Sequence, residues 1–96
     1  MKARFLSPAE EEIAESADYY FGENPQAAMS FLEEIDLAVT LIGQNPNLYP
    51  IHSEDVRVKQ LDHFPFSIFY RIDAGEAIIQ SVAHNSRKPN YWKNRL

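Results

Sequence analysis

The sequence predicts a single α+β domain in which a helical hairpin packs on a mostly antiparallel four-stranded sheet. The N-terminal half carries two stretches with apolar residues at helical spacing. The C-terminal half carries three runs rich in β-branched and aromatic residues, separated by short turns. A chain of 96 residues, 45% of them hydrophobic, has the size and composition of one globular domain. The predicted order is therefore β-α-α-β-β-β within one domain, residues 1–96.

The first strand and the first helix are predicted around a Ser-Pro pair. Residues 2–6 alternate polar and apolar side chains and end at this pair. Ser7 as N-cap, Pro8 in the first turn and Glu10 reaching back predict a capping box. The helix then ends near Gly22. Its other acidic residues, which we expect to face solvent, are Glu11, Glu12, Glu15 and Asp18.

A second helix is predicted from Asn24-Pro25, which repeats the helix-start pattern, to about Gln44. Asn45-Pro46 ends it, because the residue before a proline avoids the helical region. Its apolar residues recur at steps of three and four: Ala28, Phe31, Ile35, Val39 and Ile42. The short link between the two helices predicts an antiparallel hairpin.

The second half of the chain predicts one loop and three strands. Residues 46–55 contain two prolines and no periodicity, which is typical of a loop. Residues 56–61, 66–72 and 77–83 are strand-like, and a turn at 73–76 joins the last two. Short connections favour an antiparallel meander, with both helices covering one face.

Charge divides the chain into an acidic scaffold and a basic end. The net charge is −5, but residues 1–45 sum to −7 and the rest to +2. Residues 84–96 contain four basic side chains and no acidic one. The acidic balance argues against a broad nucleic-acid surface. No apolar run reaches the length of a membrane span and no signal core is visible, so we expect a soluble cytoplasmic protein that does not contact membranes.

The sequence predicts neither a metal site nor a cofactor. The chain has no cysteine, which excludes thiolate ligands and disulfides. The three histidines, His52, His63 and His84, lack short ligand spacing and an acidic partner motif. The paired carboxylates Glu33 and Glu34 are expected on a solvent-facing helix surface and receive no catalytic role.

The strongest candidate site is the basic, aromatic C-terminal segment at residues 85–96, together with His84. Its candidate residues are His84, Arg87, Lys88, Tyr91 and Trp92. Arginine binds phosphate or carboxylate, histidine and tyrosine move protons, and tyrosine or tryptophan stack on bases or fill interfaces. The set suits both a ribonuclease that uses the 2′-hydroxyl of its substrate and a protein-binding surface. We expect the segment to project as a working surface; the alternative is a frayed tail in which Trp92 packs down.

Three strand cations are weaker candidates. Arg57 and Lys59 lie two residues apart and so share one face of their strand, where they would extend the basic surface or deter edge-to-edge aggregation. Arg71 would meet a substrate phosphate or pair with an acid on a neighbouring strand.

Two late motifs resemble a known family. The residues FPFSIFYR at 64–71, followed by VAHNSRKPNYW at 82–92, resemble the RelE/ParE toxins of bacterial type II toxin-antitoxin modules. The resemblance spans nearly the whole chain, with the opening strand, the helix starts and the late motifs in the family's order. It implies two helices packed on a four-stranded sheet, neutralised by a small antitoxin that contacts the exposed sheet edge and the helical hairpin.

The family's two branches imply different targets. The RelE branch cleaves messenger RNA on the ribosome with a strand arginine, further basic residues and a tyrosine. Here the strand arginine falls near Ser67, which lacks the charge that would stabilise a phosphorane transition state. The resemblance therefore favours the ParE-like branch, a toxin that binds DNA gyrase and performs no chemistry of its own. Its partner-binding candidates are Arg57, Lys59, Arg87, Lys88, Tyr91 and Trp92.

Two alternatives stay open. One is a ribosome-dependent endoribonuclease that works through Arg87 and Tyr91, with His84 and Arg71. The other is an inactive relic that still binds the antitoxin. A homodimer is also compatible with the sequence.

Overall fold

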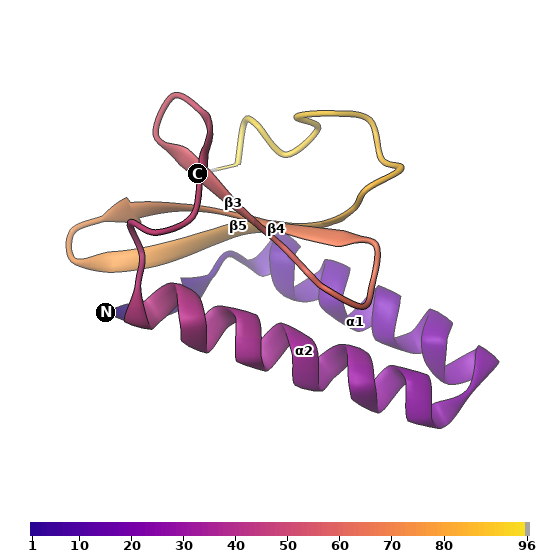
Figure 1. Cartoon of the computed structure of the whole chain (residues 1–96). Coiled ribbons are helices and arrows are strands. Elements are labelled where there is room, and N and C mark those ends of the chain that lie inside the picture. Colours follow the sequence, from indigo (N-terminus) through magenta and orange to yellow (C-terminus); the bar gives the residue numbers. More distant parts are fainter. Residues whose placement is uncertain (96) are drawn as a thin grey trace.

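The computed structural model describes residues 1–95, and it confirms the predicted α+β class. The elements are β1 (Lys2–Phe5), α1 (Ser7–Glu23), α2 (Pro25–Gln44), β2 (Ile51–Ser53), β3 (Val56–Gln60), β4 (Phe66–Asp73) and β5 (Glu76–His84). Both helices lie on one face of the sheet, whereas the segment after β5 runs over the opposite face (Figure 1). The sheet therefore lies between α2 and the basic C-terminal segment, whereas α1 reaches the segment at the edge of β5.

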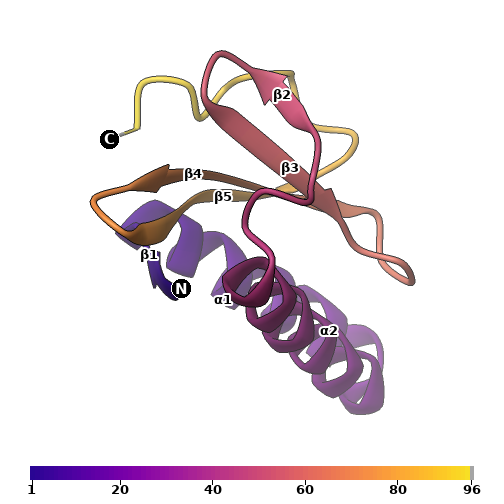
Figure 2. The same ribbon diagram turned by 60° about the vertical axis from the view of Figure 1, so that its left-hand side comes forward.

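The sheet has five strands in the order β1-β5-β4-β3-β2, where four were predicted. The additional strand, β2, lies within the predicted loop at 46–55 and pairs with β3 through Ile51↔Arg57 and Ser53↔Val56 (Figure 2). Its three residues are too few to show an alternating pattern. β1 pairs with β5 in parallel, and the other pairs are antiparallel as predicted.

One predicted helix start is wrong and the other is confirmed. The N-cap position of α1 is Leu6, and no side chain caps the helix. Leu6 instead donates its main-chain N–H to the Ile79 carbonyl at 3.0 Å, because β1 continues directly into the helix. Asn24 caps α2 as predicted, since its Oδ1 accepts from the Gln26 N–H at 2.9 Å.

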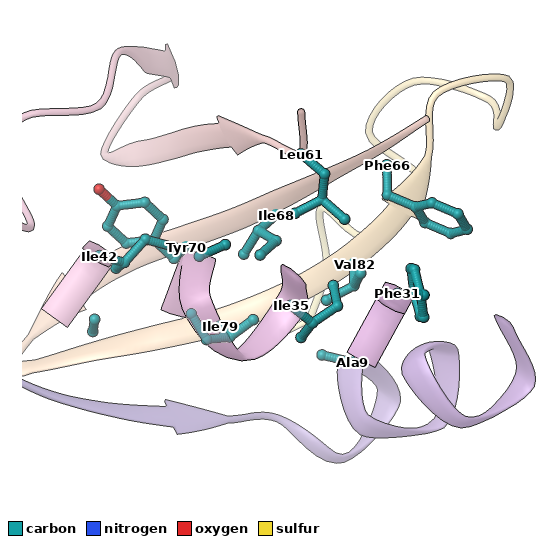
Figure 3. Packing of buried hydrophobic residues seen from close by; sticks show 12 residues of the cluster. Ala9, Phe31, Ile35, Ile42, Leu61, Phe66, Ile68, Tyr70, Ile79 and Val82 are labelled. Atoms are coloured by element: carbon teal, nitrogen blue, oxygen red, sulfur yellow. The ribbon is translucent and has the colours of Figure 1, made fainter. Parts of the chain in front are cut away.

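The core lies between α2 and the central strands (Figure 3). Apolar residues of α2 point onto β4 and β5, and the fully buried members include Phe31, Ile42, Ile68, Tyr70 and Ile79. At this surface, burial of each large side chain contributes about 1.5–3 kcal/mol. No helix within residues 1–95 is both long and apolar enough to cross a membrane.

Candidate functional site

The C-terminal segment is held on the open face of the sheet by Trp92. This residue is 2% exposed, and its ring stacks on Phe69 with centroids 4.5 Å apart. His52 of β2 contacts both rings, and its Nε2 lies 2.9 Å from Asn90 Oδ1. The expectation that Trp92 projects outward is therefore wrong. The indole covers an aromatic side chain that the helices, being on the other face, leave open.

A single carboxylate from α1 holds the segment at its other side. Glu12 Oε1 accepts from the Val82 main-chain N–H at 3.0 Å, from Ser81 Oγ at 3.1 Å and from Arg95 Nη1 at 3.0 Å. Its Oε2 accepts from the Tyr91 hydroxyl. The side chain is only 13% exposed, so the expectation that Glu12 faces solvent is wrong.

The position of Glu12 follows from the length of β1. The pairing between β1 and β5 ends at Phe5↔Ile79, so the later part of β5 is paired with β4 on one side but has no strand on its β1 side. An unpaired main-chain N–H at a sheet edge needs an acceptor. α1 passes this edge, and its Glu12 carboxylate supplies that acceptor for Val82. A helix side chain thus replaces the missing strand.

Tyr91 is a donor in this network and is poorly suited to act as a base. Burial raises the pKa of the Tyr91 hydroxyl, and its hydrogen bond to Glu12 and the charge of that carboxylate raise it further. Ser81 Oγ lies 3.2 Å from the same hydroxyl. Tyr91 therefore keeps its proton at neutral pH and is not the outward-facing group that the sequence predicted.

Arg87, Lys88 and Lys93 are the exposed cations of the segment, and Lys93 Nζ lies 4.0 Å from Glu54 Oε1, which leaves Arg87 and Lys88 to be considered as binding groups. The Arg87 guanidinium carbon lies 4.0 Å from the centroid of the Tyr91 ring, a cation–π contact that leaves its N–H groups available. No salt bridge joins either side chain to an acid within residues 1–95. His84 Nδ1 accepts from the Ser86 main-chain N–H at 3.1 Å, which places the proton of the neutral ring on Nε2.

Two cavities flank these residues. One of about 320 Å³ lies between α1, the end of β5 and the segment, and it is lined in part by Glu15, Tyr19 and Phe66. The other, of about 160 Å³, lies between the segment and the open sheet face beside Phe69. His84, Arg87 and Tyr91 border both. The side chain of Arg87 is therefore reachable from two sides.

The strand cations serve structural contacts instead. Arg57 Nη1 donates to the carbonyls of Tyr49 at 2.7 Å and Asn47 at 3.1 Å, and Lys59 Nζ lies 4.6 Å from the Tyr49 ring. Arg57 and Lys59 pair directly with core residues of β4, which places them on the helix side of the sheet, away from the C-terminal segment. Arg71 on β4 pairs with Asp73 at 3.2 Å.

Ser67 stands where the resemblance places the strand arginine of ribonuclease members. It is 5% exposed, and its hydroxyl donates to Asn85 Oδ1 at 2.7 Å. This contact fixes the start of the C-terminal segment but supplies no charge. Within the part of the chain that the structure describes, no three histidine or acidic side chains are grouped as metal ligands.

Comparison with known proteins assigns the chain to a family. The family model described as "ParE toxin of type II toxin-antitoxin system, parDE" matches residues 3–89. A solved structure described as the chromosomal ParDE TA system from P. aeruginosa has the same fold, with a TM-score of 0.78 and 23% identity over 88% of this chain and 95% of that one. Among curated protein sequences, no match was found. The family match covers most of the chain, which therefore belongs to the ParE toxin family of type II toxin-antitoxin systems.

Proposed function

We propose that this ParE-family protein stops bacterial growth by binding DNA gyrase through the surface that presents Arg87 and Lys88. The observation that carries the proposal is that Arg87 and Lys88 are exposed on a segment that is itself packed against the sheet through Trp92. Both are exposed and unpaired by acids within residues 1–95, whereas the neighbouring Trp92 is buried. Because Arg87 is already held against the Tyr91 ring, it loses less side-chain entropy when a partner binds than a free arginine would.

Several features favour binding over catalysis. Ser67 brings no positive charge to the position that the ribonuclease branch uses. The hydroxyl of Tyr91 is already donated to Glu12, and its raised pKa opposes proton abstraction at neutral pH. A 2′-hydroxyl attack would therefore lack the strand cation at position 67, and Tyr91 would be a poor base for it.

Neutralisation by a cognate antitoxin, in the cytoplasm, is the second half of the proposal. At one edge of the sheet, Glu12 and Arg95 already cover the end of β5. At the opposite edge, β2 pairs only with Val56 and Arg57, so within residues 1–95 the outer edge of β3 near Gln60 has no strand beside it. An antitoxin segment would add a strand there, and an apolar helix face would cover exposed α2 residues such as Leu37, which is 58% exposed.

A supercoiling assay with purified gyrase and plasmid tests the target. We expect the wild-type protein to inhibit supercoiling and to accumulate the cleavage complex. Arg87→Ala with Lys88→Ala should raise the half-inhibitory concentration at least about tenfold, the effect of losing roughly 1.4 kcal/mol of binding. Lys2→Ala, which removes an exposed cation from β1, is the matched control and should have little effect. Unaltered supercoiling at saturating wild-type protein would refute gyrase as the target.

Two further outcomes separate the alternatives. Primer extension after induction would show codon-register cuts that disappear in Tyr91→Phe and Arg87→Ala if the protein were a ribosome-dependent endoribonuclease. Induction without a growth defect, together with retained antitoxin binding, would identify an inactive relic. Both results would replace the gyrase proposal.

A further inference from the structure

We propose that Glu12 is the positioning residue of the target-binding surface. Its carboxylate fixes Tyr91, and the Tyr91 ring supports the Arg87 guanidinium, so a side chain of α1 sets the direction of a cation seventy-five residues later in the chain. The identity of the target rests on the proposed function. The positioning itself concerns only contacts within the protein.

The first support is convergence on one carboxylate. Two oxygens accept from donors that belong to separate parts of the fold: the Ser81 and Val82 donors of β5, and the Tyr91 and Arg95 side chains of the C-terminal segment. Hydrogen bonds to an ionised acceptor are stronger than neutral ones. Glu12 therefore joins the helix, the sheet and the segment at a single point.

The second support is charge. Two guanidinium groups approach the Tyr91 ring, with Arg87 at 4.0 Å and Arg95 at 5.2 Å from its centroid. Both groups are positively charged, and a carboxylate bound to one of them offsets part of that charge. Glu12 is bound to Arg95 and to the hydroxyl of the shared ring. Glu15 lines the same cavity but accepts no hydrogen bond from residues 85–95.

The third support is that the segment has a second, independent attachment. Trp92 stacks on Phe69 and contacts His52 on the open face of the sheet. None of these three aromatic residues forms a hydrogen bond with the Glu12 carboxylate. Loss of Glu12 should therefore leave the segment attached while the Tyr91 ring and Arg87 become mobile. The proposed antitoxin surface at the β3 edge should not change.

The experiment compares Glu12→Gln with Glu11→Gln, its exposed neighbour on α1. Glutamine keeps an acceptor for the Val82 N–H but removes the charge that holds Arg95. We expect the half-inhibitory concentration against gyrase to rise at least about tenfold for Glu12→Gln, because small displacements in a recognition site weaken it strongly. Affinity for the cognate antitoxin should stay within about twofold. Glu11→Gln should match the wild type in both assays.

A double-mutant cycle tests whether Glu12 acts through Tyr91. If it does, Glu12→Gln and Tyr91→Phe should each weaken inhibition, and the double variant should be little worse than the more severe single one. Fully additive effects would contradict the proposed chain of contacts. Equal losses of gyrase inhibition, antitoxin affinity and melting temperature in Glu12→Gln would show a general structural role and would also overturn the proposal.

Amide hydrogen exchange separates this inference from the choice of target. In Glu12→Gln we expect faster exchange in residues 85–95 and unchanged exchange in α2. If the wild-type protein does not inhibit gyrase, the target proposal fails, but the exchange data still test whether Glu12 positions the C-terminal segment. Exchange identical to that of the wild type in Glu12→Gln would refute Glu12 as the positioning residue.

Discussion

Glu12 of α1 and Glu34 of α2 invite comparison, because each helix sends one carboxylate to the sheet. Glu34 accepts from the main-chain N–H groups of Asp62 and His63, the latter at 3.1 Å, and lies 3.2 Å from the His63 imidazole. Its side chain is 15% exposed, against 13% for Glu12. Both residues were predicted to face solvent. Both instead supply acceptors to main-chain groups of the sheet or its turns.

The two carboxylates differ in what they connect. All the partners of Glu34 belong to the turn between β3 and β4, so this residue caps one local structure. Glu12 connects β5 to the C-terminal segment and neutralises Arg95. Glu34 attaches α2 to one short turn, whose position the paired strands β3 and β4 already set. Glu12, in contrast, determines where the C-terminal segment lies, so its loss should reduce target binding as well as stability.

The largest expected effect on stability is that of Glu12→Ala. The change leaves Arg95 without its acid and the Val82 N–H without its acceptor, and hydrogen bonds to charged groups contribute about 1.5–3 kcal/mol. We expect the free energy of unfolding to fall by about 2–3 kcal/mol in urea denaturation. Glu11→Ala, on the exposed neighbouring position, should change it by less than about 0.5 kcal/mol. Similar losses in both variants would show that Glu12 contributes no more to stability than its exposed neighbour.

Glu34→Ala should cost less, about 1–2 kcal/mol, as for other side chains that cap main-chain N–H groups. Gyrase inhibition should be unchanged, because Glu34 bonds only to Asp62 and His63, whereas the turn meets the C-terminal segment through a separate contact, the Asn85 N–H donating to the Pro65 carbonyl. Urea denaturation and the supercoiling assay on the same preparation measure both effects. A loss of inhibition as large as that of Glu12→Gln would contradict the local role of Glu34.

The pH dependence of stability sharpens the role of Glu34. Burial alone would raise the pKa of this carboxyl, but the main-chain hydrogen bonds from His63 and Asp62, with the His63 side chain, outweigh it and lower the pKa. Its contribution is therefore complete above the pKa of the unfolded chain, about 4.3, and is lost as pH falls through the lower folded value. Between about pH 5 and 3, the stability of the wild type should fall more steeply than that of Glu34→Gln. Parallel curves would count against this account.

Tyr91→Phe should have a smaller effect, about 1 kcal/mol, because it removes one hydroxyl and keeps the ring under Arg87. The raised pKa of Tyr91 gives a second signature, since its stabilisation is present below about pH 10 and is lost as pH rises above the unfolded value. Ultraviolet titration should therefore show one late-ionising tyrosine fewer in the variant. An unchanged titration curve would place the late ionisation elsewhere.

Periodicity predicted most of the fold but little of the site. The apolar steps of α2, from Ala28 to Ile42, repeat over five positions, and all but Val39 are buried. Glu12 was missed because it lies on the border of the apolar stripe of α1, three residues after the buried Ala9, where one chain gives no sign of an unpaired strand edge nearby. Trp92 was misjudged because the strand pattern does not show that the face of β4 carrying Phe69 is the one that the helices leave open. Both errors concern contacts between elements far apart in sequence, which local patterns do not encode.

The smallest predicted effect concerns Gln80, which lies beside the Arg95 that Glu12 holds. This residue is the extra one at the register shift between β4 and β5, and it is 4% exposed. Among residues 1–95 its Oε1 has no hydrogen-bond partner, while its Nε2 lies 3.5 Å from the Arg95 carbonyl oxygen. An unpaired buried acceptor costs stability, and methionine has a similar shape without one. Gln80→Met keeps the main-chain carbonyl that accepts from Arg95 Nη1, so the link to Glu12 should survive. We expect unchanged gyrase inhibition and a gain of up to about 1 kcal/mol in the free energy of unfolding. A loss of stability would show that the amide side chain, and not only Glu12, holds the segment against β5.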